Sequence, residues 1–323
     1  MFHTIECTQL DFNDTTFLMS YPLEAPAVMA SVATIGVVQP ILVTGCPCQG
    51  KYRILAGFRR AYAGRAIGLE TIHANIYPVE PDHLLSAFLL ALYENLAHRA
   101  FNDVEKSLIL TKLLYRFGCS RDDVIRDFLP LLGLAPHEKV LDTYLSIFTF
   151  EEALKAYLAT HEVPMTVIEL LSTLSAENRN VVFALLSTLK LGINKLKDFL
   201  VLLEEIAFRD QQTIADILAE PGIQAIFRHD KYSGPQKADL IRQALRRRRY
   251  PQLTTLEAEY HEQLSRLHLP KAVQLATDRF FEDDALTASF RFQTPEQLHT
   301  LAKELLRLSE QPELQDLFTL IQG

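Results

Sequence analysis

The chain has 323 residues, of which 48% are hydrophobic, and its formal net charge is −8 with an isoelectric point near 5.7. A chain this long and this apolar can bury a sizeable core, which excludes general disorder and favours two or three domains. The acidic balance excludes a protein coated in basic surface for wrapping DNA, so any nucleic-acid contact must come from local basic clusters.

Residues 1–80 predict a small mixed α/β domain. Apolar spacing and turn residues indicate, in chain order, a helix over 27–35, strands over 37–43 and 52–56, a helix over 58–67 and a strand over 71–77. Gly36 and Gly68 stand where the two helices must end. Pro40 has no N–H to donate to a ladder, so we expect it at a sheet edge or a bulge.

Residues 81–250 predict a mostly α-helical region, because apolar residues recur there at three- and four-residue spacing. Segments that begin at Cys119 and His137 are the two candidate helices of a helix-turn-helix-like unit, with Gly133 in the connection. No sheet of any size fits this region.

The second of these helices carries the candidate base-reading residues. A recognition helix places its early side chains against base edges. Here Lys139 and Thr143 are the candidates, beside His137. Glu138 and Asp142 would repel phosphates, so loss of sequence-specific recognition stays open.

A run of four arginines closes the helical region. Arg246, Arg247, Arg248 and Arg249 follow a helix-like run that ends at Leu245. Such a cluster suits phosphate contact with DNA, and it also suits a solvated helix end or linker. The sequence leaves both interpretations open.

Residues 251–323 predict a linker helix and a two-strand-plus-helix unit. Segments 273–281 and 286–292 form a hairpin with one apolar face. Thr294, Pro295 and Gln297 then predict a helix N-terminus. The leucines of that helix are spaced three, four, three, at Leu298, Leu301, Leu305 and Leu308.

This tail is too small to bury its own apolar seam, so we expect a homodimer in which a second subunit completes the core. The alternative, that the unit folds back onto its own chain, stays open. With the other two regions, the tail makes this an α+β protein: a small mixed domain, a helical middle and a C-terminal β-hairpin plus helix.

Location and redox state follow from what the sequence lacks. No stretch approaches the ~20 uninterrupted apolar residues of a membrane span, and the N-terminus lacks the build of a signal peptide, so we expect a cytoplasmic protein without a membrane partner. Four cysteines, Cys7, Cys46, Cys48 and Cys119, are too few for a disulfide framework. Cys46 and Cys48 could supply two metal thiolates, but no second pair completes four ligands, which favours a plain turn.

The segment Gly57-Phe58-Arg59-Arg60 lies where a strand gives way to a helix. Glycine lets a ligand approach the backbone, the first-turn amides favour an anion, and two guanidinium groups suit phosphate oxygens. The pattern predicts a phosphate cradle. Arginines that open a surface helix also pair with solvent or a nearby carboxylate, so the pattern by itself is weak.

Glu94 and Asn95, near the end of the next helix, form a second candidate constellation. A carboxylate beside a carboxamide provides the hard oxygen ligands that a magnesium ion bridging phosphates requires. A solvated helix face explains the pair equally well when it is taken alone.

Four ordered segments resemble the successive boxes of ParB partition proteins. They are Gly36–Ile41, Tyr52–Arg60, Gly68–Ala74 and Glu94–Glu105, and residues 273–308 are similar to the dimerisation domain of that family. Four boxes in order at suitable spacing are far more specific than any one of them. The resemblance is densest over residues 31–107.

The resemblance implies a first domain that binds CTP with Mg²⁺ and closes as a gate between subunits, leaving a clamp that slides on DNA. By position, Arg59 and Arg60 would hold the phosphates, with Gly57 and Gln39 near the nucleotide. Glu94 and Asn95 would serve the metal ion, and Glu94 a hydrolysis that is slow at most. The implied partners are DNA, a second copy of the chain and a ParA-type ATPase, at the nucleoid.

Two departures from the family pattern favour an alternative. Phe58 replaces the acid of the usual Gly-Glu-Arg-Arg box, and His98 stands where the family has arginine, with Arg99 beside it. A degenerate scaffold that binds protein partners without nucleotide or specific DNA is therefore the second hypothesis. Phosphotransfer with Glu94 as base ranks last, because no substrate pocket is evident.

Overall fold

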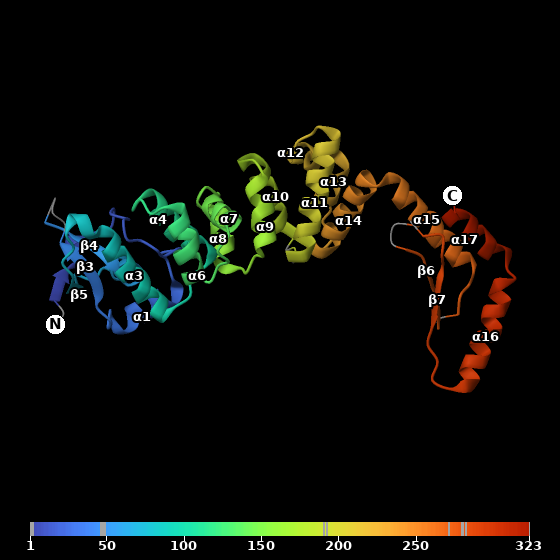
Figure 1. Ribbon diagram of the computed structural model, residues 1–323, viewed down its shortest axis with the longest axis horizontal. Coiled ribbons are helices and arrows are strands. Elements are labelled where there is room, and N and C mark those ends of the chain that lie inside the picture. The colour runs from blue at the N-terminus through green and yellow to red at the C-terminus, as the bar shows by residue number, and fades with distance from the viewer. Residues whose placement is uncertain are drawn as a thin grey trace. The chain divides into compact units, whose positions relative to one another are not determined.

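The computed structural model describes residues 3–45, 50–189, 191, 193–270, 272–278, 281 and 283–322. It divides into two compact units, Met1–Ser187 with Gly192–Lys197, and Thr188–Leu191 with Asp198–Gly323. The chain can be followed through both units in Figure 1. The predicted boundaries at residues 80 and 250 stay predictions, and the predicted Cys46 and Cys48 pair lies outside the described residues.

A five-stranded sheet opens the first unit. Its strands are β1 (His3–Glu6), β2 (Leu10–Asp11), β3 (Ile41–Gly45), β4 (Tyr52–Ala56) and β5 (Thr71–Ile76). The order is β1-β5-β3-β4-β2, with β1/β5 and β3/β4 antiparallel and β3/β5 and β2/β4 parallel. Alternate residues of β3 and the centre of β4 are fully buried, which fixes the register of both strands.

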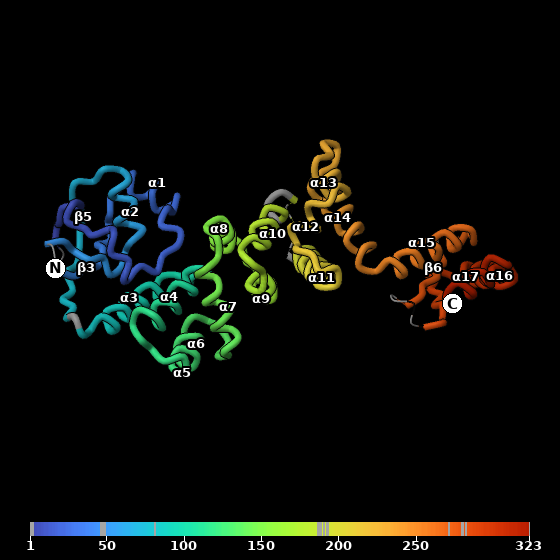
Figure 2. The backbone as a smooth tube through the Cα atoms, turned by 90° about the horizontal axis from the view of Figure 1, so that it is seen from above, coloured from blue at the N-terminus to red at the C-terminus, as the bar shows by residue number. Residues whose placement is uncertain are grey.

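Two helices accompany the sheet, α1 (Pro26–Ile35) and α2 (Phe58–Ala66), and they lie side by side in Figure 2. Both were predicted, and Gly36 ends α1 with a positive φ of 72°. The strand predicted over 37–43 begins later, at Ile41, because Pro40 cannot donate to a ladder and so precedes the strand.

Helices fill the rest of the first unit. They are α3 (Leu84–His98), α4 (Asp103–Tyr115), α5 (Arg121–Asp123), a π-helical turn (Val124–Phe128), α6 (Leu129–Leu131), α7 (Glu138–Phe148), α8 (Glu152–Thr160), α9 (Met165–Thr173) and α10 (Ala176–Leu189). Short 3-10 turns cover Cys7–Gln9 and Pro81–His83. The run from α5 to α6 and the helix α7 occupy the two segments predicted for a helix-turn-helix-like unit, and Gly133 between them has a φ of 73°.

Helix α11 (Ile193–Asp210) belongs to the first unit up to Lys197 and to the second from Asp198. The second unit continues with α12 (Ile214–Ala219), α13 (Pro221–Arg228), α14 (Gly234–Arg249) and α15 (Pro251–Arg266). A hairpin of β6 (Val273–Ala276) and β7 (Thr287–Phe290) follows, then α16 (Pro295–Ser309) and α17 (Pro312–Gln322). These elements and the N-terminal sheet confirm the predicted α+β class. Among the described residues, no helix is both long enough and apolar enough to span a bilayer.

The tail has a core of its own. Tyr260 and Leu267 of the α15 region pack with Leu308 of α16 and with Leu317 and Ile321 of α17. The helix α17 was not predicted, and it covers part of the leucine seam that we expected a second subunit to cover. Leu298 of the seam stays 37% exposed, and Leu306, a leucine of the same helix outside the seam, is 65% exposed.

The segment between β2 and α1 is fastened to α4 by a lysine. The ammonium group of Lys112 donates to the backbone carbonyls of Thr15 and Leu18, the latter at 2.6 Å. Burial lowers the pKa of Lys112 to about 8, although Asp14 opposes this shift. Keeping this ammonium group charged in the folded state therefore costs free energy of desolvation.

This cost predicts a pH dependence of stability. The folded pKa of Lys112, about 8, lies below the ordinary value of 10.5. Between these values the unfolded chain binds the proton that the folded chain has released, so stability rises with pH. Relative to Lys112→Met, the wild-type free energy of unfolding should rise by about 2 kcal/mol from pH 8 to pH 10.

Urea unfolding followed by circular dichroism measures the difference at each pH. A difference between wild type and Lys112→Met that stays flat from pH 8 to pH 10, or that falls, would contradict the assignment.

Candidate functional site

Gly57 begins α2 in a conformation that only glycine adopts freely. Its φ is +92°, and a Cβ atom there would lie 2.8 Å from Ile41 Cγ2 and 3.1 Å from Arg60 Nη2. Any side chain would therefore be strained and would displace the Arg60 guanidinium from the start of the helix. The glycine thus permits a cation to lie over the N-terminal turn of α2.

Arg60 is anchored by backbone carbonyls. Its Nη1 donates to Gln39 O at 2.8 Å and to Pro40 O at 3.0 Å. Its Nη2 lies 3.9 Å from Glu94 Oε1. Burial lowers the pKa of Arg60 and the Glu94 carboxylate opposes this effect, but a guanidinium stays protonated at any physiological pH. Four of the predicted residues, Gln39, Gly57, Arg60 and Glu94, therefore lie together.

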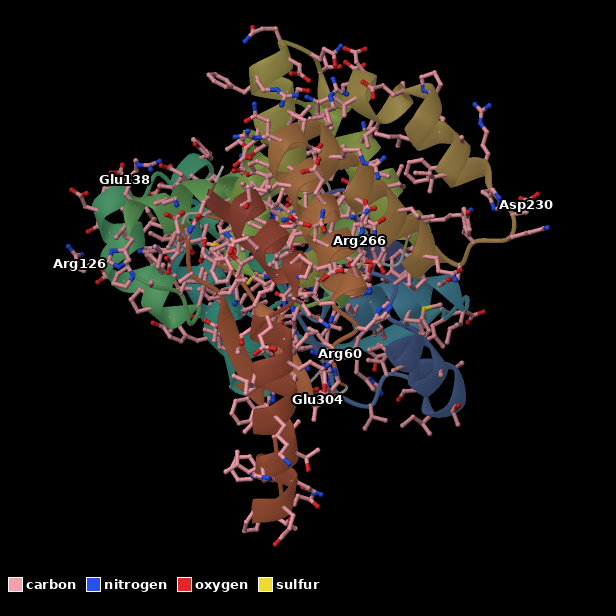
Figure 3. The ribbon with its side chains drawn as sticks, turned by 90° about the vertical axis from the view of Figure 1, so that its right-hand side faces the viewer. Arg60, Arg126, Glu138, Asp230, Arg266 and Glu304 are labelled. Carbon is pink, nitrogen blue, oxygen red and sulfur yellow. The ribbon has the colours of Figure 1, made fainter. Side chains whose placement is uncertain are left out.

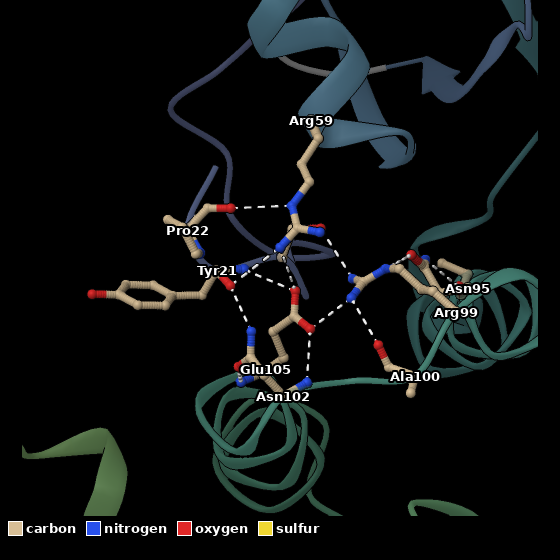
Figure 4. A network of polar contacts seen from close by, with 10 residues as sticks. Tyr21, Pro22, Arg59, Asn95, Arg99, Ala100, Asn102 and Glu105 are labelled. Atoms are coloured by element: carbon tan, nitrogen blue, oxygen red, sulfur yellow. Dashed lines mark hydrogen bonds and ion pairs between the residues drawn. The ribbon is translucent and has the colours of Figure 1, made fainter. Parts of the chain in front are cut away.

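Arg59 points from the same helix into a different set of partners (Figure 4). Its Nε donates to Pro22 O at 3.1 Å, and its Nη2 donates to Tyr21 O at 3.2 Å and to Glu105 Oε1 at 3.0 Å. Burial lowers its pKa, and Glu105 opposes that shift. Within the described part of the chain, Nη1 of Arg59 has no hydrogen-bond acceptor, so one edge of the guanidinium stays available.

Glu105 is the centre of this network and was not among the predicted site residues. It is 1% exposed and accepts hydrogen bonds from Arg59 on one oxygen and from Arg99 Nη1, at 2.6 Å, on the other. The backbone N–H groups of Tyr21 and Asn102 each donate to it at 3.1 Å. The pattern Asn102-x-x-Glu105 did carry a capping-box motif, which α4 uses, but that motif says nothing of the two arginines.

Asn95 belongs to the Arg99 side of the network. Its Nδ2 donates to Ala91 O at 2.8 Å, and its Oδ1 accepts from Arg99 Nε at 3.4 Å. His98 is exposed at the end of α3. Arg99 therefore supplies the guanidinium next to Asn95, one residue later than the family pattern has it.

The predicted metal ligands differ in how well they fit a magnesium ion. Glu94 fits, because its side chain is one-third exposed and, in the described part of the chain, has a single long ion pair, with Arg60. Asn95 does not fit in this conformation, because its carbonyl oxygen already accepts from a cation. Among the described residues no cluster of three His, Cys, Asp or Glu side chains could hold a metal ion, so phosphate oxygens would have to complete the coordination.

The predicted base-reading residues on α7 are differently placed. Lys139 is exposed and pairs with Glu169 at 2.8 Å. Thr143 is 5% exposed, and its hydroxyl donates to Lys139 O, so it faces the interior and not DNA. This geometry corrects the expectation for Thr143, because its side of the helix packs against the core.

The acids of α7 that we expected to repel phosphates are partly neutralised. Arg121 lies 2.6 Å from Asp142 and 3.4 Å from Glu138. Arg126 and Glu138 project from the outer surface of their helices (Figure 3). This face therefore has mixed charge.

Three of the four arginines at the end of α14 are held by carboxylates of the second unit. Arg246 makes two hydrogen bonds to Glu257, Arg248 pairs with Asp210 and Glu220, and Arg249 pairs with Glu205. Arg247 alone of the four is exposed without an ion pair within the described residues. DNA contact by the run stays a prediction, and three of its four arginines link helices of their own unit.

These partners predict opposite behaviour for neighbouring arginines. Arg248→Ala should lower the midpoint of thermal unfolding by a few degrees, because Glu220 loses the cation it pairs with and Asp210 keeps only its contact with Arg209 among the described residues. Arg247→Ala, the matched control, should leave the midpoint unchanged. Differential scanning calorimetry measures both. Equal midpoints for the two variants would show that the Arg248 contacts do not stabilise the unit.

The N-terminal sheet, its two helices and most of α3 coincide with a known domain. Residues 3–96 match the family model described as the ParB N-terminal domain. The chain therefore carries a ParB N-terminal domain, and the resemblance noted in the sequence is confirmed.

Among individual proteins, the probable chromosome-partitioning protein ParB of Pseudomonas putida is 30% identical over 135 residues, which cover 42% of this chain and 43% of that protein. The match thus spans less than half the length of that relative.

Solved structures that the chain resembles include two of C-terminally truncated ParB from Caulobacter crescentus. The one complexed with CTP-gamma-S has a TM-score of 0.27 at 20% identity, covering 55% of this chain and 94% of that one. The one complexed to the centromeric parS site has a TM-score of 0.34 at 17% identity, covering 60% and 96%.

Proposed function

We propose that this chain is a nucleotide-regulated, dimeric DNA-binding protein of the chromosome or plasmid partition type, with CTP and Mg²⁺ as its ligands. One observation carries the nucleotide half of this proposal. Arg59 and Arg60 both open α2, Glu94 pairs with Arg60, and Asn95 contacts Arg99, which shares Glu105 with Arg59.

The arrangement suits a triphosphate. The first-turn N–H groups of α2 and its dipole attract an anion, and Gly57 leaves room for the Arg60 guanidinium beside them. The guanidinium of Arg60 lies at that turn, and the open edge of Arg59 can donate two further hydrogen bonds. Glu94 would hold the magnesium ion together with phosphate oxygens, and CTP is the nucleotide that the ParB resemblance implies.

Hydrolysis is at most slow in this proposal. The Glu94 carboxylate could orient water, but it lies 3.9 Å from the Arg60 guanidinium, which would compete with water for the same oxygen. The protein would use nucleotide mainly as a conformational ligand.

The tail supports a dimer. Phe292, Leu298 and Leu306 expose large apolar surface in this unit. A groove of about 870 Å³ is lined mainly by residues 290–293, at and after the end of β7, and by residues of α16 that include Leu301. A second copy that covers this face would complete the leucine seam. A dimer clamp on DNA would place the protein at the nucleoid, where a ParA-type ATPase is its proposed partner.

DNA contact in this proposal rests on Lys139 and Arg247. Both are exposed basic side chains, and Arg247 has no competing carboxylate among the described residues. Such contacts go to phosphates and supply affinity without reading sequence.

The nucleotide half makes a direct prediction. The double variant Arg59→Ala, Arg60→Ala should bind CTP with Mg²⁺ at least 10-fold more weakly than wild type, because charge-assisted phosphate contacts are each worth about 1.5–3 kcal/mol. Isothermal titration calorimetry measures the affinity. Arg65→Ala is the control, because this arginine of the same helix lies over the ring of Phe12, away from the site.

Absence of binding by wild type at millimolar CTP would refute the proposal, and equal affinities for wild type and the double variant would refute the site.

A degenerate scaffold is the second candidate. Phe58, which replaces the acid of the family box, is buried in the domain core, and most of the arginines of the α14 run are satisfied within the chain. Salt decides between the two candidates. Binding to DNA with a logarithmic affinity that falls steeply with the logarithm of salt concentration supports the partition function, and no DNA binding at low salt supports the scaffold.

A further inference from the structure

A buried carboxylate joins two arginines that come from different elements. Glu105 lies in the first turn of α4, and its partners are Arg59 of α2 and Arg99, which follows α3. Both arginine side chains are one-quarter exposed, whereas the side chain of Glu105 is 1% exposed. A buried carboxylate is retained only with such compensation, so this is a built network and not a chance surface pair (Figure 4).

The network fixes the orientation of Arg59. Three of its five N–H groups are engaged, one by Pro22 O, one by Tyr21 O and one by Glu105. An exposed arginine would lose up to about 2 kcal/mol of side-chain entropy on binding a phosphate. An arginine already held at three N–H groups has lost most of that entropy beforehand, and it presents its remaining edge in one direction.

Glu105 also holds the segment that helps to hold Arg59. It accepts from the N–H of Tyr21, while Asn102 Nδ2 donates to the carbonyl of the same residue at 2.8 Å. Arg99 adds a hydrogen bond from Nη2 to Ser20 Oγ at 3.3 Å. The carbonyls that Arg59 uses are therefore themselves positioned by the start of α4.

We propose that Glu105 is a positioning residue of the nucleotide site. It holds Arg59 so that Nη1 faces the phosphates, and it ties the occupancy of that site to α4, which packs against α7. This inference rests on the proposed nucleotide function and names a residue that acts through Arg59 without touching the ligand. The cluster of two guanidinium groups and one carboxylate keeps one net positive charge for the incoming anion.

A different role for the contact between Glu105 and Arg59 predicts the opposite effect on nucleotide affinity. If Glu105 were a competing anion that phosphates must displace from Arg59, removing its charge would tighten binding. If Glu105 orients Arg59, removing its charge should weaken binding, because an arginine released from Glu105 samples more rotamers and binds phosphate less well.

The test is a double-mutant cycle on nucleotide affinity. Glu105→Gln keeps the size of the side chain and one acceptor oxygen but removes the charge. It should weaken CTP–Mg²⁺ binding about 10-fold in the wild-type background and less than about 2-fold in the Arg59→Ala background, because coupled residues do not add. Asp103→Asn is the matched control, since Asp103 is an acid of the same helical turn that instead accepts from Tyr144.

Arg59→Lys gives a second route if Glu105→Gln unfolds, which circular dichroism reveals. An ammonium group has one nitrogen and cannot satisfy Glu105 and two carbonyls while it faces a phosphate, so this charge-conserving change should weaken binding nearly as much as Arg59→Ala.

Unchanged or tighter binding by Glu105→Gln overturns the positioning role, and so does an equal loss in both backgrounds. Arg59→Lys with wild-type affinity also overturns it. If the wild-type protein binds neither CTP nor inorganic tripolyphosphate, the proposed nucleotide function itself is refuted. This outcome is distinguishable from refutation of the positioning role, which requires a wild type that binds.

Discussion

The contact on which the N-terminal site depends is the buried ion pair between Glu105 and two arginines. Burial of that carboxylate is tolerated because four donors converge on it, and the same donors fix α2, the end of α3 and the segment around Tyr21 relative to α4. Removing Arg59 or Arg99 would leave the buried carboxylate with one cation instead of two. The geometry offered to a phosphate is therefore a property of the fold and not of two flexible side chains.

Charge compensation also governs the second unit. The chain carries 40 acidic and 32 basic residues, so a basic run has ample carboxylates to pair with. In α14 the arginines turn toward Asp210, Glu205 and Glu257, and hydrogen bonds from Arg209 and then Arg248 lower the pKa of Asp210 to about 2. The run of arginines at residues 246–249 suggested DNA contact in the sequence, but three of the four form ion pairs within their own unit, and Arg247 is exposed.

Local patterns predicted much of the fold, because they depend on neighbours in sequence. The periods of α1, α2 and β4, the glycines that end helices and the cap of α16 were all evident. The strands β1 and β2 are too short to show a period, and the start of α17, Pro312 followed by Glu313, was overlooked. The sequence predicted part of the site, because Gly57, Arg60 and Glu94 were named as site residues and do lie together. Glu105 was missed, because its partners Arg59 and Arg99 are 46 and 6 residues away in the chain.

The most direct measurement is a crystal structure of the full chain grown with Mg²⁺ and a slowly hydrolysed CTP analogue. The account predicts phosphate oxygens within about 3 Å of Arg59 Nη1 and of the Arg60 guanidinium, with Arg59 still bonded to Glu105. A nucleotide bound elsewhere, or phosphates at this helix with Arg59 turned away from both ligand and Glu105, would contradict it.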